Sequence, residues 1–108
     1  MTDLPELGPD EALARVRAGA KLIDVRERDE WDAVHAPEAV LLPMSELQER
    51  LGELPHDEEL LIVCHSGARS ARVTAFLNRE GYDAANVAGG MLAWPGEVVS
   101  EGPSAPTG

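Results

Sequence analysis

The sequence predicts an α/β fold in three layers: a central, mostly parallel β-sheet with helices on both of its faces. Strand-like and helix-like segments alternate along the 108 residues, and this alternation favours parallel strands joined by helices. Residues 60–63 are apolar at every position, which is typical of a strand buried on both faces. The length suits one domain with a hydrophobic core of its own.

Short apolar runs that end at charged or turn-forming residues predict the strands. The first run ends beside Asp24 and Arg26, which we interpret as a structural polar pair at a strand end, and another is closed by Pro43. The four expected strands are residues 20–25, 39–42, 60–63 and 86–88.

Helices are predicted from apolar spacing and from start and stop signals. Ser45 followed by Gln48 has the spacing of a capping box, and the leucines after it recur at helical intervals. Gly19 and Gly81 lie just beyond two expected helix ends. The four candidate helices are residues 9–18, 27–34, 45–54 and 70–80.

One domain is expected over residues 4–98. The remaining residues, 99–108, are polar and rich in Pro and Gly, so we expect a disordered tail. The formal charge of −11 argues against nucleic acid or an anionic membrane as the main partner. No apolar run approaches a membrane span, and the acidic N-terminus is unlike a secretory signal. We therefore expect a soluble, cytoplasmic protein.

Cys64 is the only cysteine, which excludes a disulfide within the chain. No His/Cys cluster has the spacing of a zinc site, so nothing in the sequence calls for a metal or a cofactor. A lone cysteine is either a small buried apolar residue or a nucleophile. Cys64 follows the most apolar strand directly, and ligands of parallel α/β sheets bind beyond the carboxyl ends of strands. Its position therefore favours a nucleophile.

The residues after Cys64 predict an anion-binding loop. A short loop between a buried strand and a helix can turn its backbone N–H groups inward, and Gly67 permits the backbone angles that this needs. A thiol at its centre is favoured as thiolate. Ser70 can cap the following helix, and Arg69 adds a positive charge. Residues 60–79 contain three arginines and no acid, which favours a small anionic substrate.

Three motifs in this chain resemble those of the rhodaneses, the thiosulfate sulfurtransferases. Residues 64–70 read CHSGARS and resemble the active-site loop of that family. Residues 24–26 read DVR and are followed by Glu30 and Trp31, and residues 89–94 read GGMLAW. All three stand in the family's order and spacing. Val34 and Glu38 depart from the pattern, because they replace two glycines of the family's turn with residues that resist positive φ.

The resemblance implies a rhodanese-like three-layer fold and ping-pong sulfur transfer by Cys64. The thiolate takes the outer sulfur of thiosulfate or a similar anionic donor and becomes a persulfide. Cyanide, a thiol or a sulfur-carrier protein then accepts the sulfur. Arg69 orients the donor, and the loop's N–H groups hold the charge. The implied substrate-binding residues are His65, Ser66, Gly67, Ala68, Arg69 and Ser70.

Two other functions stay open from the sequence. A phosphatase or arsenate reductase is disfavoured, because those enzymes use a Cys-x5-Arg loop and Arg69 here completes a Cys-x4-Arg spacing. A persulfide relay module that serves a protein partner without turnover is the main alternative.

Residues near the motifs are interpreted structurally. His35 is expected to hold its turn by hydrogen bonds, and the acids of residues 27–32 to form a solvated helix face. For His65 a functional and a solvent-facing role are both open.

Overall fold

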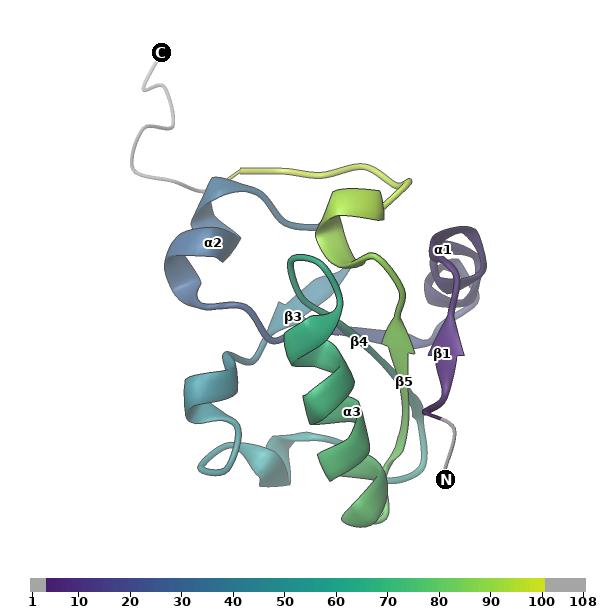
Figure 1. The fold of residues 1–108 in the computed structure, drawn as a ribbon, viewed down its shortest axis with the longest axis vertical. Helices are drawn as coiled ribbons and strands as arrows, with labels where there is room; N and C mark the ends of the chain where they lie inside the picture. The colour runs from purple at the N-terminus through teal and green to yellow at the C-terminus, as the bar shows by residue number, and fades with distance from the viewer. Residues whose placement is uncertain (1–3, 101–108) are drawn as a thin grey trace.

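The computed structural model describes residues 4–100 and places five parallel strands in one sheet (Figure 1). The strands follow the spatial order β1-β5-β4-β2-β3. Strand β4 is central, and its partners β2 and β5 are both parallel to it. The five strands are β1 (Glu6–Leu7), β2 (Lys21–Asp24), β3 (Ala39–Leu41), β4 (Glu59–Val63) and β5 (Asp83–Val87). The predicted fold class is confirmed, and the sheet is parallel throughout.

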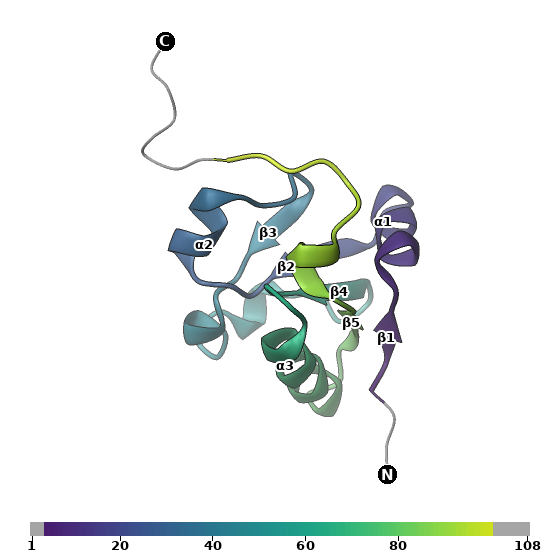
Figure 2. The same ribbon diagram turned by 45° about the horizontal axis from the view of Figure 1, so that its top comes forward.

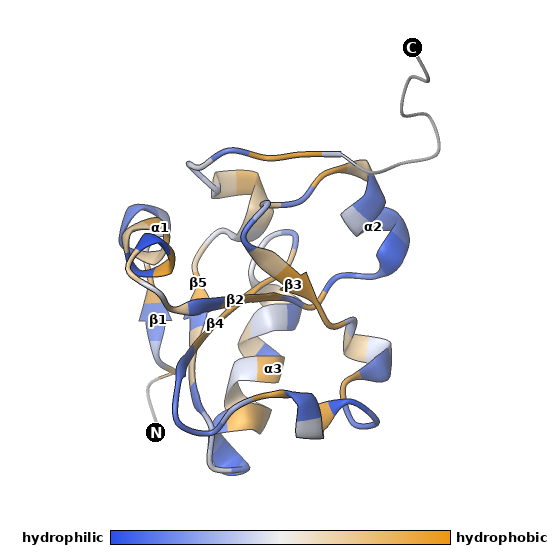
Figure 3. Ribbon diagram, turned by 180° about the vertical axis from the view of Figure 1, so that it is seen from behind, coloured by the Kyte–Doolittle hydropathy of each residue, from blue (hydrophilic) through white to orange (hydrophobic). Residues whose placement is uncertain are grey.

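Two apolar clusters lie on opposite faces of the sheet, which makes three layers. Alternate residues of β4 point to opposite faces, so Leu60 and Ile62 pack toward helix α3 (Ala68–Arg79), whereas Leu61 and Val63 pack toward helix α1 (Pro9–Arg17). Figure 3 shows β2 and β4 mostly hydrophobic, in contrast to the hydrophilic helix α2 (Arg28–Ala33). No helix among residues 4–100 is long and apolar enough to cross a membrane.

The prediction of a helix over residues 45–54 is wrong. Two short 3₁₀ helices, η1 (Met44–Glu46) and η2 (Leu51–Glu53), occupy this segment. The Ser45 hydroxyl donates to Glu27 Oε1 at 2.8 Å instead of closing a capping box. Leu47 and Leu54 are buried all the same. The spacing of the leucines therefore predicted correctly that Leu47 and Leu54 are buried. It predicted one α-helix wrongly, because the segment forms two short 3₁₀ helices.

Helix α3 begins at Ala68, two residues before the expected start. Its N-cap is Gly67, with φ of 111°, and no side chain caps the helix. The capping role predicted for Ser70 is therefore wrong, since Ser70 lies inside the first turn. At the sheet edge, β1 was not predicted, because two residues carry no periodic pattern. It pairs with β5, which begins earlier than expected.

The turn after α2 is closed by the C-terminal segment. His35 and Val99 form an antiparallel bridge, with N–H···O distances of 2.9 and 2.8 Å. Ser100 Oγ also donates to the carbonyl of Asp32 at 3.2 Å. In Figure 2 the segment crosses from the short helix η3 (Gly90–Ala93) toward α2. Val99 and Ser100 fall within the predicted tail, and the rest of that tail lies outside the described residues.

No described residue other than glycine has a positive φ. The turn at residues 34–39 therefore forms without the left-handed backbone that glycines would allow at Val34 and Glu38. His35 holds the turn as expected, because its Nδ1 lies 2.8 Å from the carbonyl oxygen of Trp31 and its ring stacks on the Trp31 indole.

Candidate active site

Cys64 lies directly after β4, at the carboxyl edge of the sheet. Its side chain packs on the α3 face and is 1% exposed. The chain then curls through exposed His65 and Ser66 to Gly67 before α3 begins (Figure 1). The positive φ of Gly67 makes this sharp curl possible, because a side chain would strain it.

Three hydrogen-bond donors converge on the Cys64 sulfur. The backbone N–H groups of Gly67 and Ser70 lie 3.1 and 3.3 Å from Sγ. The hydroxyl of fully buried Ser70 lies 3.2 Å from it. The first turn of a helix leaves N–H groups without an intrahelical acceptor, so the start of α3 supplies donors at this point. The arrangement suits a sulfur anion.

These contacts lower the pKa of the Cys64 thiol. Burial is the largest single influence and raises the pKa, but hydrogen bonds from the Ser70 hydroxyl and from the backbone of Ser70, Gly67 and Ser66 together outweigh it. The folded chain therefore favours the thiolate, the reactive form of cysteine, more than an unperturbed cysteine does.

We expect Ser70→Ala to slow alkylation of Cys64 by iodoacetamide about tenfold at slightly acidic pH. A hydrogen bond to a charged group is worth about 1.5 kcal/mol or more, so its loss raises the thiol pKa and moves the alkylation profile to higher pH. Thr74→Val is the matched control, because Thr74 is also buried on α3 and its hydroxyl has no partner among the described residues. Equal profiles for the two variants would contradict the role of the Ser70 hydroxyl.

The segment that begins with Gly89 and Gly90 holds the loop after Cys64 by backbone hydrogen bonds. The N–H groups of Met91 and Leu92 donate to the carbonyls of Cys64 at 2.7 Å and His65 at 3.1 Å. Gly90 has φ of 58°, and a Cβ placed there would meet the Cys64 carbonyl oxygen at 2.4 Å. Only glycine lets η3 approach this closely, so the two carbonyls are held against η3.

Asn86 connects the loop to the sheet edge. It is 2% exposed, and its Nδ2 donates to Glu6 Oε2 at 2.9 Å and to the Gly67 carbonyl at 3.4 Å. Sequence reasoning missed this residue. Its only signal was a polar side chain between two apolar residues, Ala85 and Val87.

The polar pair predicted for Asp24 and Arg26 at the end of β2 is present and buried. Arg26 Nη2 lies 2.8 Å from Asp24 Oδ2, and the two side chains are 3% and 0% exposed. The same nitrogen donates to the carbonyl of Val34 at 2.6 Å. The pair thus joins the end of β2 to the turn after α2.

Arg69 forms a bidentate ion pair with Glu30. Its Nη1 and Nη2 each lie 2.8 Å from one Glu30 carboxylate oxygen. The Arg69 guanidinium is the main cause that lowers the pKa of Glu30 to about 2. The solvated helix face predicted for residues 27–32 is therefore wrong for Glu30, and for Glu27, whose side chain caps α2. The positive charge of Arg69 is therefore balanced by a carboxylate of the same chain, in a partly exposed ion pair.

The structure brings together only some of the predicted site residues around the sulfur. Cys64, Gly67 and Ser70 are in contact, and Ser66 contributes its backbone. His65 is exposed, and its side chain makes no hydrogen bond with any residue of 4–100. Among the same residues, no group of three His, Cys, Asp or Glu side chains could hold a metal ion.

Comparison with known proteins identifies the family. The model of the rhodanese-like domain matches residues 8–97. The chain belongs to this family. The putative sulfurtransferase YtwF of Bacillus subtilis is 42% identical over 77 residues, which cover 71% of this chain and 75% of YtwF. The thiosulfate sulfurtransferase GlpE of Pseudomonas savastanoi pv. phaseolicola is 31% identical over 92% of this chain and 98% of its own length.

Two further similarities bear on the rhodanese-like assignment. A rhodanese-like domain protein from Staphylococcus aureus superposes with a TM-score of 0.84 and 32% identity, over 92% of this chain and 100% of that one. The putative sulfur carrier protein YrkF of Bacillus subtilis is 32% identical over 90% of this chain, which spans only 54% of YrkF. The resemblance inferred from the three motifs is thereby confirmed.

Proposed function

We propose that this protein is a sulfurtransferase that passes sulfane sulfur from thiosulfate, or a similar anionic donor, through a Cys64 persulfide to a thiophilic acceptor. One observation carries the proposal: three donors converge on the sulfur of a buried cysteine whose pKa is lowered. A persulfide has a negative outer sulfur, and the same loop is suited to hold it.

In the first half-reaction the Cys64 thiolate attacks the outer sulfur of thiosulfate. A bond forms between Sγ and this sulfur, and the bond to the sulfonate sulfur breaks. Sulfite leaves with the electron pair, so the persulfide carries the charge that the thiolate brought. The N–H groups of Ala68 and Arg69, which the first helical turn leaves without intrahelical acceptors, would donate to the outer sulfur.

Arg69 would orient the donor by directed hydrogen bonds more than by net charge. A guanidinium has five N–H donors, and Glu30 accepts from two nitrogens while it balances the charge. The remaining donors can still meet a sulfonate oxygen.

Intact mass measurement tests the function directly. Incubation with thiosulfate should add the mass of one sulfur atom to the protein, and cyanide should remove it as thiocyanate. Cys64→Ser should never gain this mass, because no other thiol exists in the chain. An unmodified wild-type mass, with alkylation showing that the thiol is free, would count against sulfur transfer from thiosulfate.

A persulfide relay is the second candidate, and the similarity to a protein named as a putative sulfur carrier favours it. A relay would take sulfur from a protein donor such as a cysteine desulfurase and turn over thiosulfate and cyanide poorly. Comparing loading from the desulfurase with steady-state formation of thiocyanate separates the two functions.

We expect Glu30→Gln to speed persulfide formation from thiosulfate about tenfold at low ionic strength, since Arg69 then presents an unbalanced charge to a dianion. Added salt should remove this gain, because it screens partly exposed charges. The wild-type rate should change little with salt. Glu53→Gln is the control, because it makes the same charge change in the exposed pair with Arg50. Equal salt dependence in both variants would contradict the role of Glu30.

A further inference from the structure

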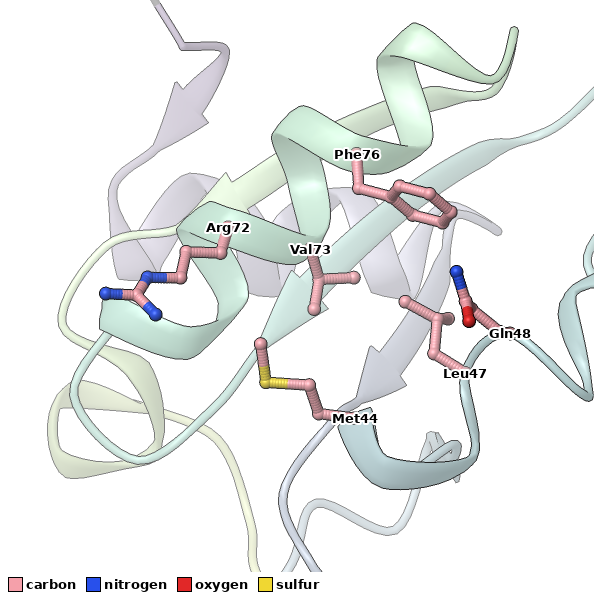
Figure 4. Close-up of a pocket in the computed structure, with 6 residues that line it drawn as sticks. All are labelled: Met44, Leu47, Gln48, Arg72, Val73 and Phe76. Carbon is pink, nitrogen blue, oxygen red and sulfur yellow. The ribbon is translucent and has the colours of Figure 1, made fainter.

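An apolar pocket of about 220 Å³ lies between α3 and the segment that carries η1. Figure 4 shows Val73 and Phe76 of α3 facing the residues 44–48 segment, whereas the Arg72 side chain extends away from that segment toward the start of α3. Most of the lining is apolar, and one side chain is cationic. The lining residues are Met44, Leu47, Gln48, Arg72, Val73 and Phe76.

The pocket and the Cys64 side chain lie on the same face of the sheet. Cys64, Leu47 and Val73 belong to one apolar cluster. Val73 lies three residues after Ser70, whose hydroxyl contacts Sγ, and residues three apart on a helix are neighbours, with Cβ atoms about 5–6 Å apart. The pocket therefore begins about one helical turn beyond the residue that touches the sulfur.

Backbone hydrogen bonds connect the two places across the sheet edge. Val25 donates to the carbonyl of Val63, the last residue before Cys64, and Met44 donates to the carbonyl of Val25, both at 3.0 Å. Met44 is thus connected through Val25 to the end of β4 by two backbone hydrogen bonds. These bonds fix the position of one pocket-lining residue relative to the strand that precedes Cys64.

Arg72 is the cation at the rim of this pocket that has no partner in the described chain. It is exposed, and it forms no ion pair or side-chain hydrogen bond with any residue of 4–100. It lies three residues after Arg69, so the two arginines neighbour each other on α3. Glu30 balances Arg69, which leaves Arg72 as the positive charge available to a ligand.

We propose that this pocket binds the organic part of the sulfur acceptor, and that the acceptor is a small thiol that carries a carboxylate. The inference rests on the proposed function. The apolar side chains would bury the carbon chain, and Arg72 would pair with the carboxylate. Small-molecule sites commonly combine a mostly apolar lining with one or a few charged groups that set orientation. The modest volume suits an acceptor of a few carbon atoms.

The acceptor step then balances as a second displacement. The bound thiol gives its proton to solvent, and its thiolate attacks the outer sulfur of the Cys64 persulfide. A new S–S bond forms on the acceptor while the bond to Sγ breaks. The electron pair returns to Sγ, where Gly67 and Ser70 donate. The products are the Cys64 thiolate and an organic persulfide.

Binding is tested first on Cys64→Ser, which cannot react. Titration with 3-mercaptopropionate should shift the backbone amide resonances of residues 44–48 and 72–76. Arg72→Gln in the same background should weaken this binding about fivefold, the value of a partly exposed ion pair. Arg79→Gln is the matched control, because Arg79 is also an exposed arginine of α3 but does not line the pocket. Absence of shifts in the pocket, or equal weakening by both substitutions, would overturn the site.

Acceptor use is tested on protein carrying the Cys64 persulfide. We compare the rates at which 3-mercaptopropionate and uncharged 3-mercaptopropan-1-ol discharge it, as a ratio within each variant. The rate with 3-mercaptopropionate should be about five times the rate with 3-mercaptopropan-1-ol in the wild type and in Arg79→Gln. In Arg72→Gln the two rates should be about equal. A wild-type ratio of one, with cyanide still removing the sulfur, would overturn the acceptor role and leave the proposed function standing. Failure to load with thiosulfate would count against the proposed function, while the binding titration still decides the pocket.

Discussion

Gly90→Ala is expected to lower the free energy of unfolding by about 2–4 kcal/mol and to disable Cys64. The new Cβ would lie 2.4 Å from the Cys64 carbonyl oxygen and 2.5 Å from that of His65. Relieving such overpacking costs about 1–3 kcal/mol, and the left-handed backbone costs a non-glycine residue about 1 kcal/mol more. The loop must move to make room, so its N–H donors leave the sulfur and the pKa of the Cys64 thiol rises.

Gly19→Ala separates the backbone cost from the collision. Gly19 also has a positive φ, of 116°, but nothing lies within 4 Å of an added Cβ. It should therefore lose only about 1 kcal/mol of stability, the backbone cost alone, and keep the wild-type alkylation rate. Urea denaturation and iodoacetamide kinetics measure both quantities. If the two variants lose equal stability and equal thiol reactivity, the contact between η3 and the loop does not position the nucleophile.

The sequence predicted the centre of the fold well because local signals and tertiary packing agree there. Leu60 and Ile62 face one apolar layer and Leu61 and Val63 the other, so the unbroken apolar run had one reasonable interpretation. The position of Cys64 followed from that strand. At residues 45–54 the local capping signal did not match the tertiary contacts, because the Ser45 hydroxyl donates to Glu27, a residue 18 positions earlier, and not within its own segment.

The contacts that surround the sulfur were less predictable, since they join distant parts of the chain. Arg69 and Glu30 are 39 residues apart, and although Glu30 belongs to one of the three family motifs, its local sequence does not indicate that it pairs with Arg69. Ser70 was expected at a helix cap because serine is common there, but Gly67 takes that place and frees the hydroxyl for the sulfur. Only the folded geometry shows which of these polar groups meet.

Asp24→Ala is expected to destabilise the protein by about 3–5 kcal/mol, because it leaves the buried Arg26 guanidinium without its carboxylate. Asp24 accepts from the Nε, the Nη2 and the backbone N–H of Arg26. After the substitution the carbonyl of Val34 is the acceptor that remains for the guanidinium among the contacts described. Glu53→Ala breaks the exposed pair with Arg50 and should cost less than about 1 kcal/mol.

The double variant Asp24→Ala/Arg26→Met shows how much of the lost stability comes from the unpaired Arg26 guanidinium. Replacing a buried ion pair by apolar side chains is often nearly neutral, so the double variant should recover at least half of the stability that Asp24→Ala loses. It also removes the hydrogen bond to Val34, which joins the end of β2 to the turn after α2. If urea denaturation finds the double variant no more stable than Asp24→Ala, the loss arises from that missing link and not from an uncompensated guanidinium.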